Sequence, residues 1–325
     1  MGNGADKIIN VLEQKGIKYD GIFASDGFVR DKVFHGFKIS SYGELKKKFG
    51  DMVVLLCFGS DRDDVRQNVL KIAAEQELFA PEVPVIGDGL FCAEYYLSHK
   101  DEFDFVRSHL SDELSVKTFD NIINYKISGK IDYLLDCETE TDEPYKSFLN
   151  LCDNESFLDL GAYTGDTVIE FTKRVARYDS IIAAEPDFKN FKKLLLNTES
   201  LSNIRCENVG ISNVTKTDTF SMQGGRNSVA SKNGTKILFF SVDDLVGNSK
   251  ITFIKMDIEG QELNAIIGGV NTIKQNKPKM RIAAYHRTED FLKIPQAVLK
   301  INSDYRVYLR HFKSLPAWDT DFYFI

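Results

Sequence analysis

The sequence predicts an α/β protein with two domains. Apolar runs rich in β-branched residues alternate with longer amphipathic segments along most of its 325 residues, which is the pattern of parallel strands joined by crossover helices. A chain of this length exceeds what one hydrophobic core usually serves. We therefore expect a smaller α/β domain in the first part and a larger parallel sheet in the second.

The composition is that of a globular protein and excludes several classes of function. The net charge of −7 gives no reason to expect nucleic-acid binding, since phosphate contacts need clustered cations. No apolar run approaches the length of a membrane span. The five cysteines include no C-x-x-C pair, so neither a disulfide framework nor a thiolate zinc site is indicated. We expect a cytoplasmic protein, and the oligomeric state stays open.

Residues 1–90 are expected to form the smaller domain, which resembles small Rossmann-like modules. Strands are predicted at 19–24 and 52–58, followed by a helix at 64–78. Gly4 and Asp26 are spaced like parts of a nucleotide-binding βαβ unit, although its first strand would have to precede residue 1. Two interpretations stay open, a structural module or a site for a nucleotide or a nucleotide-linked sugar. The aromatic-rich residues 91–150 are predicted to be a helical linking region.

Residues 151–325 are predicted to form the larger domain. Its expected helices are 164–178 and 189–196. Its expected strands are 156–160, 181–184, 204–210, 251–256, 279–286, 305–309 and 321–325.

The first candidate site element is FLDLGAYTGDT at 157–167, a strand that enters a glycine-containing turn and then a helix. Ligands of open α/β sheets bind at the carboxyl ends of strands, where such a turn lets the backbone approach them. Asp159 either orients the loop or reaches the charged amino-acid end of a cofactor. We assign cofactor contacts to Asp159, Gly161, Ala162, Tyr163, Thr164 and Gly165.

Two acidic residues follow neighbouring predicted strands. Glu185 comes directly after strand 181–184 and is placed to accept the ribose hydroxyls of an adenosine group. Asp257 ends the strand in FIKMDIEGQE at 253–262, and we count it as a cofactor contact too. A nicotinamide-dependent oxidoreductase would share these features, but its G-x-G-x-x-G loop is absent.

DLGAYTGDT, AEPD, KMDIEGQE and the strand ending in AYHR together resemble the FkbM-type methyltransferases over about 155–325. The resemblance implies a class I fold, a doubly wound seven-stranded sheet with an antiparallel last strand. It also implies S-adenosylmethionine as cofactor and O-methylation, often of sugars. Many class I enzymes have a further glycine where this chain has Tyr163, which puts the loop's backbone contacts in question.

Methyl transfer to a hydroxyl needs an aligned acceptor and a group that takes its proton. We expect His286, at the end of strand 279–286, or Asp257 to be that base, and favour His286. Acceptor contacts are assigned to Arg226, Asn227, Ser228, Glu259 and Arg287. Glu259 and Glu262 are expected in the first turn of the helix after Asp257. No metal is expected, the weaker alternative being a site of Asp257, Glu259 and His286.

The sequence therefore predicts an S-adenosylmethionine-dependent O-methyltransferase acting on a small-molecule or glycan acceptor, with a sugar or polyol hydroxyl as the target. The alternatives are an inactive scaffold that keeps the fold and an NAD-dependent oxidoreductase. The identity of the acceptor and of the methylated atom stays open.

Overall fold

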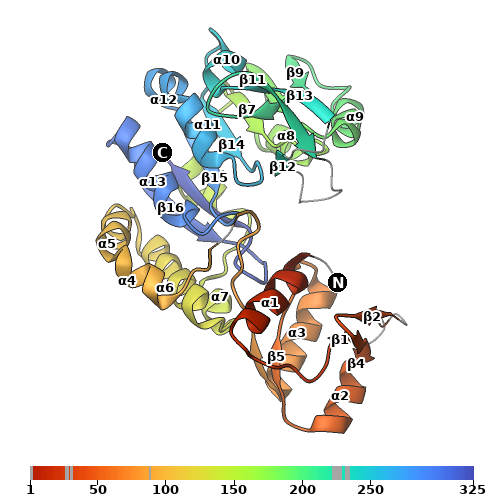
Figure 1. The fold of residues 1–325 in the computed structure, drawn as a ribbon. Helices are drawn as coiled ribbons and strands as arrows, with labels where there is room; N and C mark the ends of the chain where they lie inside the picture. Colours follow the sequence, from red (N-terminus) through yellow and green to blue (C-terminus); the bar gives the residue numbers. More distant parts are fainter. Residues whose placement is uncertain (1–2, 26–28, 30–31, 88, 222–228, 231–234) are drawn as a thin grey trace. The chain divides into compact units, whose positions relative to one another are not determined.

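The computed structural model describes residues 3–25, 29, 32–87, 89–221, 229–230 and 235–325 (Figure 1). The chain divides into two compact units. One consists of Met1–Val83, Asn121–Asp136 and Lys313–Trp318, and the other of Pro84–Asp120, Cys137–Phe312 and Asp319–Ile325. The units interleave along the sequence, so the domain ranges 1–90, 91–150 and 151–325 stay a prediction.

The first unit is a small α/β structure whose strands pair two by two. Strand β1 (Phe23–Ala24) runs parallel to β4 (Ser40–Ser41), and β5 (Val53–Leu55) runs parallel to β6 (Glu77–Phe79). The remaining elements are α1 (Asn3–Gln14), the antiparallel pair β2 (Val33–Phe34) and β3 (Phe37–Lys38), α2 (Tyr42–Phe49) and α3 (Asp63–Glu75).

A cluster of Tyr42, Val54 and Ile72 forms a core in this unit, with Phe23 and Leu78 packed against it. The predicted helix 64–78 is too long, because α3 ends at Glu75 and Leu78 lies in β6. Gln76 is extended there, and the chain turns directly into a parallel strand beside β5. The candidate nucleotide residue Asp26 lies outside the described residues.

The second unit is built on a seven-stranded sheet ordered β16-β17-β15-β14-β7-β8-β9. The strands are β7 (Ser156–Leu160), β8 (Ser180–Ala184), β9 (Ile204–Glu207), β14 (Phe253–Met256), β15 (Lys279–Ala283), β16 (Val307–His311) and β17 (Thr320–Phe324). β17 runs antiparallel to both of its neighbours, β16 and β15, and a parallel row is formed by β15, β14, β7, β8 and β9. The predicted fold class, with an antiparallel last strand, is confirmed.

Helices accompany this sheet along the chain. They are α4 (Ala93–Ser98), α5 (Lys100–Ser108), α6 (Glu113–Ser128), α7 (Asp132–Cys137), η1 (Tyr145–Leu149), α8 (Asp166–Arg174), α9 (Phe188–Asn197), α10 (Val242–Val246), α11 (Glu262–Gly268), α12 (Val270–Asn276) and α13 (Asp290–Ile301). Both α6 and α7 have residues in both units. In the part of the chain that the structure describes, none of the helices is long and apolar enough to cross a bilayer.

Aromatic side chains show which helices cover each face of the sheet. Phe157 of β7 stacks on Phe171 of α8, with ring centroids 4.6 Å apart. Tyr323 of β17 meets Phe148 of η1 on the same face. Successive strand residues point to opposite faces, and Phe322 contacts Phe291 of α13. Helices therefore pack on both faces, as a doubly wound sheet requires.

The predicted strand 204–210 is interrupted in the structure. β9 ends at Glu207, and the chain continues as β10 (Gly210–Ile211) in a separate sheet ordered β10-β13-β11-β12, whose other strands are β11 (Lys216–Ser221), β12 (Val229–Ala230) and β13 (Thr235–Phe240). A Cβ on Gly210 would lie 2.3 Å from the ring of Phe239. Only glycine allows this close approach, which brings β10 beside β13.

Candidate functional site

The predicted site residues gather at the carboxyl edge of three adjacent strands. In the registers of β14, β7 and β8, Met256 is level with Leu160, and Leu160 with Ala184. Asp257, Gly161 and Glu185 are the next residue of each strand. The sheet therefore brings the glycine loop and two carboxylates to one level of one edge, where α/β folds bind their ligands.

The glycine loop is held close to the neighbouring strand end. The amides of Gly161 and Ala162 both donate to the carbonyl of Ala184, each at 3.0 Å. Gly161 has φ +83°, and a Cβ there would lie 1.9 Å from the carbonyl oxygen of Asp257. Both the left-handed backbone and this distance require glycine. Tyr163 also has a positive φ of 46° and stays half exposed, so its phenol lies at the surface of the loop.

Asp159 and Lys255 form a buried ion pair beneath this loop. The Asp159 side chain is fully buried, and its Oδ1 lies 3.4 Å from Nζ of Lys255. The same Nζ donates to the carbonyl of Gly161 at 2.9 Å. Burial raises the pKa of Asp159, and Lys255 opposes that rise. Of the two roles expected for Asp159, this arrangement favours orienting the loop over touching a cofactor.

Glu185 connects the loop to the start of α9. Its Oε2 accepts from the amide of Tyr163 and its Oε1 from the amide of Asp187, both at 2.9 Å. Each carboxylate oxygen has a second lone pair, so both can still accept a hydroxyl. Burial raises the pKa of Glu185 to about 7, although these two amides oppose the rise. The side chain therefore changes charge close to neutral pH.

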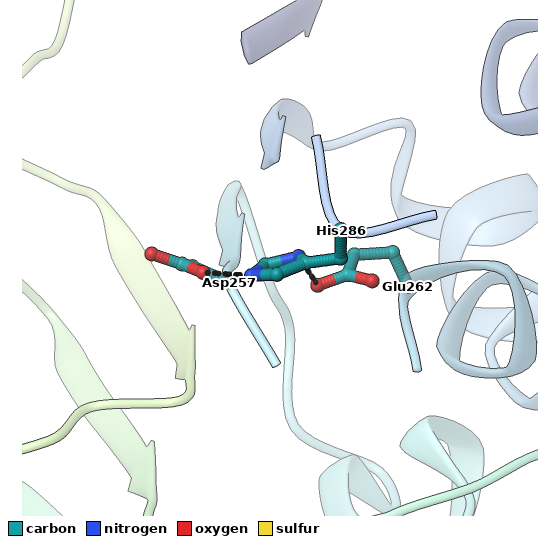
Figure 2. A group of neighbouring side chains, drawn as sticks. All are labelled: Asp257, Glu262 and His286. Atoms are coloured by element: carbon teal, nitrogen blue, oxygen red, sulfur yellow. Dashed lines mark ion pairs between the residues drawn. The ribbon is translucent and has the colours of Figure 1, made fainter. Parts of the chain in front are cut away.

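His286 lies directly beside several carboxylates. Its Nε2 is 3.4 Å from Oδ1 of Asp257 and 3.6 Å from Oε2 of Glu259, and its Nδ1 is 3.0 Å from Oε1 of Glu262. The His286 and Glu262 side chains are buried, whereas the Asp257 side chain is 39% exposed. Figure 2 shows the imidazole between the carboxylates of Asp257 and Glu262. The phenol of Tyr285 donates to Oδ1 of Asp257 at 3.2 Å.

These charges set the protonation state of the pair formed by His286 and Asp257. Burial alone lowers the pKa of His286, but Glu262, Asp257 and Glu259 outweigh it and raise the pKa to about 10. Burial acts to raise the pKa of Asp257, yet Lys255 and His286 bring it below its ordinary value. At neutral pH this arrangement is an imidazolium beside carboxylates, which counts against His286 as a base in the resting protein.

Residues 159–311, which contain every one of these groups, match the family model described as the methyltransferase FkbM domain. These residues form an FkbM-type methyltransferase domain. The computed structure is also similar to the crystal structure of methyltransferase FkbM from Methylobacillus flagellatus KT, with a TM-score of 0.73 and 24% sequence identity. That likeness covers 94% of this chain and 83% of the other, and it shows a shared fold.

Lower similarities are found to other methyltransferase structures. Fibrillarin from Aeropyrum pernix, in complex with natively bound S-adenosyl-L-methionine, has a TM-score of 0.35 at 13% identity, covering 53% of this chain and 67% of fibrillarin. Precorrin-6y C5,15-methyltransferase from Geobacter metallireducens has a TM-score of 0.35 at 12% identity, covering 54% and 82%. No curated protein matches the sequence at a significant level.

The residues after Asp257 in the FkbM domain differ in part from the expectation. Helix α11 begins at Glu262, as expected for that residue, but Glu259 precedes it and has φ +53°. The expectation that Glu259 lies in the first helical turn is therefore wrong, because the chain makes a left-handed turn at Glu259 and Gly260 before the helix begins. This turn brings Glu259 beside His286.

The structure describes only some of the residues expected to contact the acceptor. The guanidinium of Arg287 donates through Nε to the carbonyl of Gly260 at 2.8 Å, which places it beside the left-handed turn. Arg226, Asn227 and Ser228 lie outside the described residues. Ala162 is fully buried and therefore offers a ligand mainly its backbone, whereas the carbonyl of Thr164 already accepts from the side-chain amide of Asn197.

Lys255 and Tyr285 contact the FkbM site but were missed as site residues. A lysine inside the apolar strand FIKM was the available signal, because a charged side chain in a buried strand needs a partner. In the sheet, Lys255 is the register partner of Asp159. No signal of this kind marked Tyr285, since an aromatic residue at a strand end is ordinary core composition.

Proposed function

We propose that this chain is an S-adenosylmethionine-dependent O-methyltransferase whose acceptor is a sugar or polyol hydroxyl. One observation carries the proposal. The Gly161 loop, Glu185 and Asp257 come directly after the ends of three adjacent strands and lie side by side at one edge of the sheet. This arrangement supports the proposal because one edge then offers a close backbone approach and two carboxylates, of which we assign Glu185 to a ribose and Asp257 to the reacting group. The acceptor class rests on the FkbM resemblance alone.

The cofactor site is proposed to use the loop and Glu185. Glu185 accepts the two ribose hydroxyls through its remaining lone pairs, while the loop from Gly161 to Gly165 borders the methionine part. Asp159 acts indirectly, because Lys255 pairs with it and holds the Gly161 carbonyl. Tyr163, 53% exposed, is positioned to cover the loop and exclude water. S-adenosylmethionine supplies an activated methyl group on a sulfonium.

Asp257 is proposed as the group that receives the acceptor's proton. It is the more exposed partner in its pair with His286, and its lowered pKa keeps it ionised at neutral pH. His286 and Tyr285 both contact its Oδ1. This assignment reverses the preference for His286 as base, since an imidazole with a pKa near 10 already holds its proton. Glu259 and Arg287 stay proposed acceptor contacts.

Calorimetric titration of S-adenosylmethionine and S-adenosylhomocysteine into the protein tests the cofactor assignment, with NADH as the control ligand. Saturable binding of both sulfur compounds is expected, weakened at least about tenfold by Glu185→Ala through the loss of two hydrogen bonds. Glu199→Ala, which removes an exposed carboxylate after α9, should leave affinity unchanged.

The other outcomes of this titration separate the alternatives. Binding of NADH without the sulfur compounds would favour an oxidoreductase, and binding of neither would favour an inactive scaffold. Transfer is then measured with S-adenosylmethionine labelled in its methyl group and a panel of sugars and polyols. Label on a nitrogen or carbon atom of the product would refute O-methylation while keeping the cofactor.

A cytoplasmic location is proposed on the five scattered cysteines, which the structure leaves as free thiols. The first unit is proposed to be a Rossmann-like module with either a structural or a nucleotide-binding role. Its two parallel strand pairs support the α/β part of that proposal.

A further inference from the structure

Asp257, Glu262 and His286 bring potential metal ligands together at the edge of the sheet (Figure 2). Asp257 follows β14, Glu262 begins α11, and His286 lies three residues beyond β15. One ligand atom from each of the three side chains lies within 4.8 Å of those of the other two. Oxygens and a nitrogen bound to one cation at 2.0 to 2.4 Å are separated by about 3 to 4.6 Å. The three groups therefore lie at distances suited to one shared ion, and the imidazole, which now lies between the two carboxylates (Figure 2), would have to turn to bind it.

Glu262, the most deeply buried member of this cluster, has unmet bonding capacity. Glu262 is fully buried, and its Oε1 accepts from the amide of Ile258 at 2.8 Å. Among the described residues, its Oε2 has no hydrogen-bond partner, whereas Nδ1 of His286 lies 3.0 Å from Oε1 of Glu262. Buried polar atoms are rarely left in this state without an ion or a water. A ligand is thus indicated independently of the cluster's negative charge.

The charges around the cluster are unbalanced. The carboxylates of Asp257, Glu259 and Glu262 all lie within 3.6 Å of His286. Lys255 offsets part of this charge at Asp257, but its Nζ also pairs with Asp159, and Arg287 donates to the carbonyl of Gly260. A divalent cation would balance charge that one imidazole cannot.

We propose that Asp257, Glu262 and His286 bind one divalent transition-metal ion such as Mn²⁺ or Zn²⁺. The donor set decides the class, because an imidazole favours transition metals over Mg²⁺ and Ca²⁺, while two carboxylates are poor partners for soft ions. This set of ligands differs from the metal site considered from the sequence, which had Glu259 where the structure has the buried Glu262. Three protein ligands leave coordination positions free for a substrate.

Asp257 gives the ion an open side. Its side chain is 39% exposed while those of Glu262 and His286 are at most 2% exposed. An acceptor hydroxyl that reaches Asp257 would also reach the ion, which would hold its oxygen and lower its pKa, and its proton would pass to the Asp257 oxygen that does not bind the ion. This consequence rests on the proposed methyl transfer, whereas ion binding itself does not.

Mn²⁺ binding tests the site without any turnover. Free Mn²⁺ is followed by electron paramagnetic resonance as it is titrated into the full chain, and Zn²⁺ and Mg²⁺ are then added as competitors. One ion per chain is expected, displaced by Zn²⁺ more readily than by Mg²⁺. Asp257→Asn and Glu262→Gln should each weaken Mn²⁺ binding by at least about tenfold. Asp304→Asn, at an exposed carboxylate, is the matched control.

S-adenosylhomocysteine titration and thermal unfolding of the same samples separate the possible failures. A variant that keeps its unfolding midpoint and its cofactor affinity but loses Mn²⁺ supports the site. Absence of Mn²⁺ binding in the unmodified protein, or binding that Asp257→Asn and Glu262→Gln leave unchanged, overturns it. Cofactor binding without Mn²⁺ binding would refute the metal site alone, and the reverse result would refute the proposed function alone.

Discussion

Replacing Lys255 by Met should destabilise the second unit, because it leaves Asp159 buried without its partner. At the observed 3.4 Å, two unit charges attract by about 5 kcal/mol at an effective dielectric constant near 20. Breaking a buried pair typically costs about 3 to 5 kcal/mol. Burial already raises the pKa of Asp159, so uptake of a proton relieves part of this cost. We expect a loss near about 3 kcal/mol in the free energy of unfolding.

The assay must report on the second unit. The single tryptophan, Trp318, belongs to the first unit, so hydrogen exchange of the β7 and β14 amides is the better measurement. Lys250→Met removes an exposed lysine just before β14 and should change little. Lys255→Met combined with Asp159→Asn should recover much of the loss, since no unpaired charge remains. A loss below about 1 kcal/mol, or a double variant no better than the single one, would refute the buried-pair reasoning.

Three further outcomes are expected. Gly161→Ala should reduce S-adenosylhomocysteine affinity in calorimetry by at least about tenfold, because its Cβ would lie 1.9 Å from the carbonyl oxygen of Asp257; unchanged affinity would contradict the tight loop. The pKa of Glu185 is about 7, so its carboxylate gains a proton as the pH falls. S-adenosylhomocysteine affinity should therefore drop about tenfold from pH 8 to pH 6. Glu185→Gln should remove most of this pH dependence. Phe291→Ala should lower the free energy of unfolding by about 3 to 5 kcal/mol, measured by hydrogen exchange of the β17 amides. The reason is that Phe291 is fully buried and stacks on Phe119, with ring centroids 5.0 Å apart. A loss under about 1 kcal/mol would show that the packing is loose.

The carboxyl-edge site could be predicted because it depends on local order along the chain. Gly161, Glu185 and Asp257 each follow an apolar strand directly, and parallel strands bring their carboxyl ends to one edge. Placing three such strands side by side then suffices to bring the three residues together. The FkbM resemblance implied the seven-stranded sheet and its antiparallel last strand, but the order of the strands was not predicted, since periodicity alone does not fix the neighbours of a strand.

Features that depend on distant contacts were not predictable in this way. The left-handed turn at Glu259 and the contact of Glu262 with His286 arise where two strand ends meet, and helical periodicity gives no warning of either. The division into units depends on pairings such as Ser60 with Leu315, separated by most of the chain. The split after Glu207 depends on the ring of Phe239 packing over Gly210.

A crystal structure of the protein with S-adenosylhomocysteine bound tests the central claim most directly. We predict that the ribose hydroxyls lie within hydrogen-bond distance of the Glu185 carboxylate, with the sulfur beside the loop from Gly161 to Gly165 and facing Asp257. A ligand bound elsewhere, or a ribose turned away from Glu185, would contradict the proposed site.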